Sequence, residues 1–97
     1  MSKFARKVDA NQAEIVAALV SAGAMVQSMA SVGRGCPDLL VGHNGRWVVM
    51  EVKDGTLPAS ARQLREAQRV WMLTAETHGL PAVVVTDVVS ALAAIVK

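Results

Sequence analysis

The apolar residues of the first third of the chain recur at the spacing of a helix. They stand at i, i+3, i+4 and i+7 and are Ile15, Ala18, Leu19 and Ala22. This spacing places them on one face of an amphipathic helix that begins at about Asn11. Gly23 is positioned to end that helix as a left-handed cap. A weaker alternation of apolar and polar residues over 25–30 predicts a strand directly after it.

The middle of the chain carries the pattern of a β-hairpin. Two apolar runs, 39–41 and 46–53, flank His43-Asn44-Gly45, and Asn-Gly between apolar runs is a strong short-range hairpin signal.

A second helix, a strand and a third helix are predicted after the hairpin. The apolar face of the second helix is marked by Leu64, Ala67, Gln68, Trp71, Met72 and Ala75, and this helix ends before Gly79. The β-branched run 82–85 predicts a buried strand, and 87–96 a last helix with Thr86 or Asp87 as its N-cap. The predicted order is α-β-β-β-α-β-α, an α/β fold with a mixed central sheet flanked by helices.

Composition narrows the class of protein. The 97 residues are enough for one domain, and 53% hydrophobic with 19% charged residues excludes the signature of intrinsic disorder. A single cysteine, Cys36, rules out an internal disulfide and suits a reducing compartment. No apolar run approaches the ~20 residues of a membrane helix, so we expect a cytoplasmic protein without a membrane partner.

Residues 1–8, with three basic side chains and no acid, are predicted to form a flexible basic arm.

The hairpin predicts where two acids meet. If Asn44 and Gly45 are the two central residues of the turn, His43 pairs with Arg46, and the same register places Asp38 opposite Glu51. Directly opposite residues have Cβ atoms only about 4.5–5.5 Å apart, so two carboxylates there repel unless a cation neutralises them. A three-residue loop would instead place Asp38 opposite Met50.

Alternation along the second hairpin strand adds a lysine to this pair. It puts Glu51 and Lys53 on one face of the sheet and Val52 on the other. Two acids and a lysine are the minimal set for metal-assisted hydrolysis of a phosphodiester, because Mg²⁺ is held by one or two carboxylates and stabilises charge on the scissile phosphate. The alternative is structural: Pro37-Asp38 is a common turn pair, and Glu-x-Lys is common on a solvated edge strand.

Two further polar residues are candidates for the same site. Gln68 falls on the inward face of the second helix, where its amide needs a partner such as a carboxylate or a water, unless it lies at the solvated edge of that face. Asn11-x-x-Glu14 has the spacing of a capping box at the start of the first helix. The alternative is that Glu14 lies in the outer coordination sphere of the metal.

These motifs together resemble a known nuclease family. Gly35-x-Pro37-Asp38, then Glu51-Val52-Lys53, then a helix bearing Gln68 and a following valine strand are similar to the VRR-NUC branch of the PD-(D/E)XK nucleases, over nearly the whole chain from about residue 8. The resemblance implies a restriction-endonuclease-like core. The family commonly has Leu-Thr-Pro before the helix glutamine; this chain lacks Thr-Pro, and Gln63 is a nearby rival to Gln68.

The resemblance also implies roles for particular residues. Asp38 and Glu51 would ligate Mg²⁺ or Mn²⁺ together with the backbone carbonyl of Val52. Lys53 would assist the attacking water or steady the transition state, while Gln68 matches the family's helix glutamine and Glu14 its first-helix acid. Similar small stand-alone proteins of phages and bacteria act as homodimers on branched DNA such as Holliday junctions.

The charge pattern is compatible with a nucleic-acid partner. The basic residues expected to contact DNA phosphates are Arg34, Arg46, Arg62, Arg65 and Arg69. Three of them, at 62, 65 and 69, form one helical stripe if the second helix begins early enough, although a solvated helix face has the same pattern.

Trp47 and Trp71 are predicted to be core or dimer-interface residues. The sequence thus predicts a Mg²⁺-dependent endodeoxyribonuclease; the alternative is a non-catalytic DNA-binding or assembly protein with the same fold.

Overall fold

The helices and strands follow the predicted order in the computed structural model, which describes residues 8–96. Their bounds are α1 Gln12–Ser21, β1 Met25–Ser28, β2 Leu39–His43, β3 Arg46–Val52, α2 Glu66–Thr77, β4 Ala82–Val85 and α3 Val88–Ile95, with a 3₁₀ turn, η1, at Ala59–Arg62. The predicted arm 1–8 falls almost wholly outside the described residues. None of the helices in 8–96 is long and apolar enough to cross a membrane.

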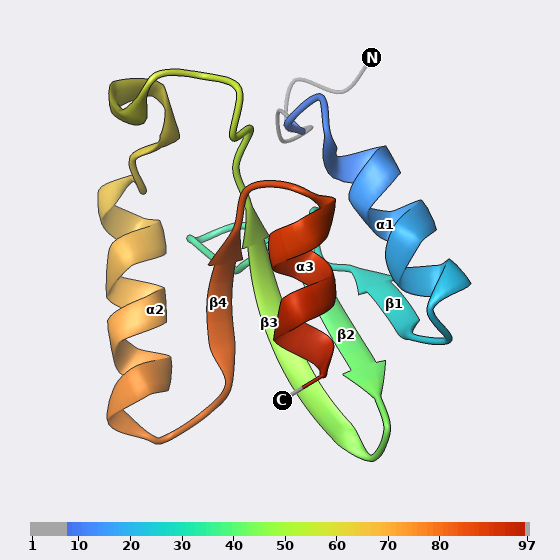
Figure 1. Cartoon of the computed structure of the whole chain (residues 1–97). Helices are drawn as coiled ribbons and strands as arrows, with labels where there is room; N and C mark the ends of the chain where they lie inside the picture. The colour runs from blue at the N-terminus through green and yellow to red at the C-terminus, as the bar shows by residue number, and fades with distance from the viewer. Residues whose placement is uncertain (1–7, 97) are drawn as a thin grey trace.

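The four strands form one mixed sheet in the order β1-β2-β3-β4 (Figure 1). β1 pairs with β2 and β2 with β3 in antiparallel fashion, whereas β3 and β4 are parallel. The parallel pair requires a long connection from one end of the sheet to the other, and η1 and α2 lie within it. The structure therefore confirms an α/β fold with a mixed sheet and three helices.

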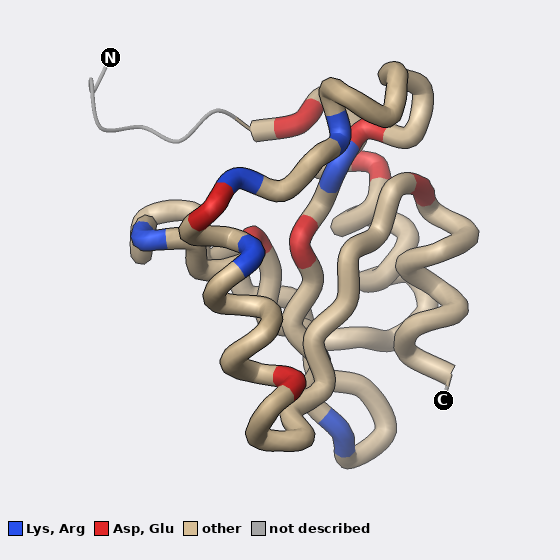
Figure 2. Tube along the Cα trace, turned by 90° about the vertical axis from the view of Figure 1, so that its left-hand side faces the viewer, with Lys and Arg blue, Asp and Glu red and all other residues tan. Residues whose placement is uncertain are grey.

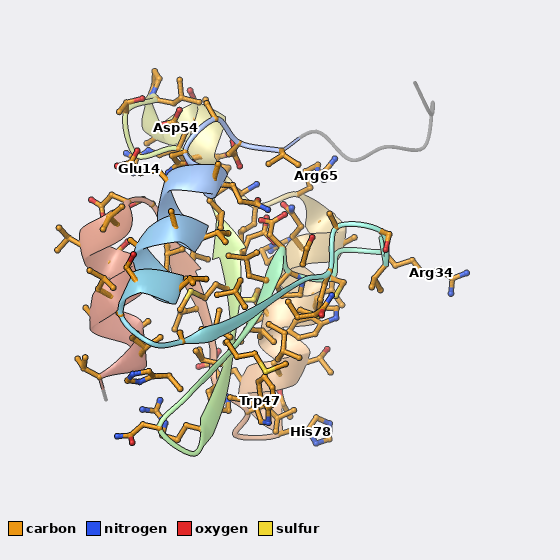
Figure 3. The ribbon with its side chains drawn as sticks, turned by 90° about the vertical axis from the view of Figure 1, so that its right-hand side faces the viewer. Glu14, Arg34, Trp47, Asp54, Arg65 and His78 are labelled. Carbon is orange, nitrogen blue, oxygen red and sulfur yellow. The ribbon has the colours of Figure 1, made fainter. Side chains whose placement is uncertain are left out.

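The main hydrophobic core lies on one face of the sheet. Alternate β3 residues Met50 and Val52 are fully buried there, against Ile15 and Leu19 of α1 and Ile95 of α3. Figures 1 and 3 show α1 and α3 together on this face and α2 on the opposite one. The side chains of β3 that alternate with the core therefore face α2.

The hairpin has the predicted two-residue turn. Asn44 and Gly45 both have positive φ, 55° and 82°, the conformation that a type I′ turn requires at both central positions. His43 pairs with Arg46, and the pairing continues to Leu39 and Met50. The register that aligns Asp38 with Glu51 is confirmed, and the three-residue alternative is wrong.

The structure corrects the start of one helix and decides the N-cap of another. α2 begins at Glu66 rather than near Leu64, because residues 59–62 form η1 and Gln63 is extended. Asp87 is the N-cap of α3, since its side chain accepts a 2.7 Å hydrogen bond from the Ser90 N–H. That bond decides between the two predicted caps.

Candidate active site

Glu51 lies at the end of β3 on the face turned toward α2. Its side chain is buried, with 2% of the residue exposed. The Gln68 amide donates a 2.9 Å hydrogen bond to its Oε2, and the Lys53 Nζ lies 3.7 Å from the same oxygen. The predicted common face of Glu51 and Lys53 is therefore confirmed.

Gln68 joins the helix to the sheet. Its Oε1 accepts hydrogen bonds from the Arg65 N–H at 2.9 Å and from Lys53 Nζ at 3.3 Å, while its Nε2 donates to Glu51. The first of these bonds belongs to the N-cap geometry of α2, in which Gln68 is the N3 residue. The cap thus fixes the orientation of the amide that contacts both charged residues.

The structure also distinguishes the two candidate glutamines. Gln68 is only 3% exposed, whereas Gln63 is exposed in the extended segment before α2. Gln68 is the glutamine that meets Glu51.

Asp38 meets the same end of β3 from the neighbouring strand. It precedes β2, is 4% exposed, and its Oδ2 accepts a 2.8 Å hydrogen bond from the Val52 N–H. Its backbone carbonyl accepts another, also 2.8 Å, from the Met29 N–H next to β1. Asp38 is therefore tied to the strands on either side of its own.

The donor set fits a hard divalent cation. The carboxylates of Asp38 and Glu51 are both buried at this end of β3, and the backbone of Val52 lies next to them. They offer oxygen ligands, which Mg²⁺ and Mn²⁺ prefer. Each carboxylate has two oxygens with several acceptor sites, so the bonds to Val52 and Gln68 leave it able to ligate. Among residues 8–96 no group of three or more His, Cys, Asp or Glu forms a metal cluster, so such an ion would rely on water for its remaining ligands.

The loop before Asp38 packs directly on the start of α2. Gly33, Arg34 and Gly35 have consecutive positive φ values of 74°, 57° and 79°. A Cβ on Gly35 would lie 2.3 Å from the Ala67 carbonyl oxygen and 2.8 Å from the Gln68 backbone nitrogen. The absence of a side chain at Gly35 allows the Asp38 loop and the Gln68 turn to touch.

A cleft of about 710 Å³ opens between this loop and the segment 57–61. Arg34, Lys53, Arg65 and Gln68 line it, and Asp9 is the acid in its described wall. The cleft therefore carries three cationic side chains, which suit an anionic ligand, and it reaches the site through Lys53 and Gln68, the two residues that contact Glu51.

Only part of the predicted basic surface gathers at this cleft. Arg46 lies in the hairpin, five residues from Glu51 along β3 and so about 17 Å away. Figure 2 shows Lys and Arg gathered at the other end of the molecule, away from this hairpin. The expected helical stripe is wrong as well, because Arg62 belongs to η1 and Arg65 is the N-cap of α2. Arg69 forms an ion pair with Glu66 on the exposed surface of α2.

Glu14 is not brought to the site. It is exposed on α1 and lines a separate small pocket with Asp54 and Asp87. Figure 3 shows Glu14 beside Asp54, on the side of the molecule away from Arg34 and Arg65. The Thr56 hydroxyl and N–H both donate to Asp54 and lower its pKa, so this acid stays ionised in its own turn.

The predicted capping box is wrong too, and its asparagine has another role. Asn11 makes no side-chain cap bond; its Nδ2 donates to the Lys53 carbonyl at 3.2 Å and to the Thr86 carbonyl at 3.0 Å. Lys53 N–H in turn donates to the Val85 carbonyl at 2.9 Å. The start of α1 thus holds the backbone of the site lysine against β4, a role that an Asn before a helix does not reveal in sequence.

No family model, curated protein or solved structure matches the chain. The site places two buried carboxylates, an ammonium group and an amide at one strand end, beneath a basic cleft.

Proposed function

We propose that this protein is a Mg²⁺-dependent endonuclease that hydrolyses DNA phosphodiester bonds and belongs to the VRR-NUC branch of the PD-(D/E)XK nucleases. One observation carries the proposal: the Gln68 amide contacts both Glu51 and Lys53 beside the buried Asp38. A structural role for Glu-x-Lys on a solvated edge is a poor account of these residues, because β3 is an inner strand and Glu51 is buried.

Each side chain has a task in the proposed reaction. Asp38, Glu51 and the Val52 carbonyl would hold Mg²⁺ or Mn²⁺, which when bound neutralises phosphate charge and lowers the pKa of water. Lys53, whose Nζ lies 3.7 Å from Glu51 Oε2, would assist the attacking water or steady the charge of the transition state. Gln68 holds the Lys53 ammonium group and the Glu51 carboxylate in place, because it accepts a hydrogen bond from Lys53 and donates one to Glu51.

The cleft supports a polyanionic substrate held by its backbone. Arg34, Lys53 and Arg65 can pair with phosphates, and no aromatic side chain lines the described part of the cleft to stack on bases. Such contacts read phosphate position and DNA shape rather than sequence. We therefore expect structured substrates, with branched DNA such as Holliday junctions as the first to test.

The decisive experiment compares Asp38→Asn with the parent on a panel of junctions, flaps and linear duplexes, with and without Mg²⁺. Loss of a metal ligand should cost several kcal/mol in the transition state, at least about 100-fold in cleavage rate. Asp54→Asn is the matched control, since it removes the same charge from an exposed turn next to Lys53 and should cut like the parent. Parent and Asp38→Asn should bind DNA alike in the presence of EDTA.

A stability measurement tests the metal site without relying on cleavage. Added Mg²⁺ or Mn²⁺ should raise the Tm of the parent more than that of Asp38→Asn, because only ions that bind the folded state stabilise it. At 100 times Kd the expected gain is about 2.7 kcal/mol. Equal Tm shifts in the two proteins would exclude this site, and DNA binding without any cleavage would favour the non-catalytic alternative.

A further inference from the structure

Trp47 lies at the opposite end of β3 from the candidate active site. The sequence predicted a core or interface position, but 52% of the residue is exposed, so the core prediction is wrong. Trp47 and Glu51 are four residues apart on β3, and therefore share a face of the sheet and lie about 13 Å apart. Figure 3 shows Trp47 on the same side of the molecule as Arg34 and Arg65 of the cleft.

The indole ring of Trp47 lies flat on a glycine. Trp47 pairs with Gly42 of β2, and Gly42 pairs with Met25 of β1, so the three residues form one row across the sheet. A Cβ on Gly42 would lie 2.8, 3.1 and 3.2 Å from three consecutive atoms of the six-membered ring. A ring that approached edge-on would bring only one atom so close, so the ring turns a face toward Gly42. The missing side chain of Gly42 makes room for it.

The other face of the ring is open to solvent. Because one face lies on Gly42, the large exposed fraction of Trp47 belongs to the outer face, and the neighbouring Met25 is 62% exposed as well. α2 is the helix on this side of the sheet, and it packs on β4 at the sheet edge. A flat, open aromatic face that is held by the backbone beneath it is suited to stacking on another ring.

A hollow of about 350 Å³ lies at the same row of residues. Trp47, Met25 and Gly42 line it together with His43 and Arg46 of the hairpin. Its described lining contains no acid, so no carboxylate there repels a phosphate. An aromatic face combined with positive charge is the means by which proteins hold single-stranded nucleic acids without regard to sequence.

We propose that Trp47 is a stacking platform for an unpaired base of the strand whose phosphate lies in the catalytic cleft. This inference rests on the proposed function, because cleft and platform would hold the same strand. A stacked DNA strand carries a phosphate about every 3.4 Å along its axis, so the distance from Glu51 to Trp47 spans roughly four nucleotides. Arg46, which is too far from Glu51 to serve the cleft, would pair with a phosphate next to the stacked base.

The platform also narrows the class of substrate. A base inside an intact duplex is covered on both faces by its neighbours, and removing it from the stack costs energy that an unpaired base does not require. Trp47 therefore favours DNA with unpaired nucleotides near the scissile phosphate, such as a flap, over a fully paired duplex.

The test compares the binding of two single strands in EDTA, measured by fluorescence anisotropy. One strand is a run of thymidines, and the other has the same length and the same phosphates but no bases. The parent should bind the thymidine strand roughly 5–150-fold more tightly, which is the contribution of one stacked base. Trp47→Ala should abolish this preference and leave binding of the baseless strand unchanged, whereas Trp47→Phe, which keeps a ring, should retain part of it.

Leu73→Ala is the matched control, because Leu73 is 54% exposed on α2 and lies outside the hollow. It should bind both strands as the parent does. A second measurement keeps the ring in place: in Trp71→Phe, Trp47 is the one remaining tryptophan. The thymidine strand should quench its fluorescence, and the baseless strand should not.

The outcomes separate the platform from the proposed function. Equal weakening of both strands by Trp47→Ala, an unchanged preference in that variant, or no quenching of Trp47 would overturn the platform. Cleavage of DNA by a parent that shows no preference for bases would overturn the platform alone. A base preference that depends on Trp47, without cleavage in Mg²⁺, would overturn the nuclease and support the platform, and a parent that binds neither strand would overturn both.

Discussion

Gly35→Ala should be far more damaging than its small size suggests. The residue has φ of 79°, and a left-handed conformation costs a residue with a Cβ roughly 1–2 kcal/mol. The new methyl would also lie 2.3 Å from the Ala67 carbonyl oxygen. That neighbour is backbone and cannot rotate away, so the loop or the start of α2 must move, at a typical cost of about 1–3 kcal/mol.

Gly33→Ala is the matched control for this prediction. Gly33 lies in the same loop with φ of 74°, but a Cβ there meets nothing within 4 Å. It should therefore cost only the conformational part, about 1–2 kcal/mol, against about 2–5 kcal/mol for Gly35→Ala. Urea unfolding of the two variants and the parent measures both values, and the difference between the variants isolates the contact with α2.

Displacement of the Gly35 loop or of the start of α2 should also lower the rate of cleavage. Gly35 precedes Asp38 by three residues and touches the Gln68 backbone, so moving either segment separates the proposed metal ligand from the amide that holds Glu51. We expect Gly35→Ala to lower cleavage under conditions in which it remains folded, and Gly33→Ala to do so much less. Equal unfolding free energies for the two variants would refute the reasoning, because then the close approach at Gly35 would carry no weight.

Three smaller predictions test other parts of the site. Gln68→Ala should slow cleavage about 10–100-fold, the usual cost of losing a group that orients a metal ligand, whereas Gln63→Ala should leave the rate unchanged. Asn11→Ala should lower the free energy of unfolding by about 1–3 kcal/mol in urea, since two carbonyls lose their donor. Hydrogen bonds from the Ser90 backbone and side chain hold the pKa of Asp87 below its ordinary 3.8. The ionised form of Asp87 therefore stabilises the fold above pH 3.8, and this stability is lost as the pH falls through the lowered pKa. Asp87→Asn should accordingly show a smaller drop in Tm between pH 6 and pH 3 than the parent.

The sequence predicted best where the structure is determined by local rules. Asn44-Gly45 specifies a two-residue turn, the turn specifies the register, and the register aligns Asp38 with the Glu51 end of β3. Period-two alternation then assigns Glu51 and Lys53 to the face away from the core. Each step needs only neighbouring residues, so the centre of the site could be read before any tertiary contact was known.

The errors arose where tertiary contacts compete with local ones. Asn11 has the residue type and spacing of a helix cap, but the carbonyls of Lys53 and Thr86 come within reach of its amide and take both of its hydrogens. The basic stripe failed because η1 ends the helical periodicity before Arg65. Neither partner of Asn11 is close to it in sequence, so no local pattern could indicate this arrangement.

The docking of α2 and the chemistry of the site depend on the same hydrogen bonds. All residues of α2 are described by the structure, and only Gln68 and Ala75 among them are buried. Apolar packing by itself would therefore hold this helix only weakly. Gln68 adds a polar attachment through its bonds to Glu51 and Lys53, and a buried amide is costly unless such bonds are made. Anything that draws Glu51 or Lys53 away, including a competing ligand, therefore loosens α2 as well. A cation that fixes the carboxylate in place should accordingly tighten the helix, and slower hydrogen exchange in α2 on adding Mg²⁺ would reveal that coupling.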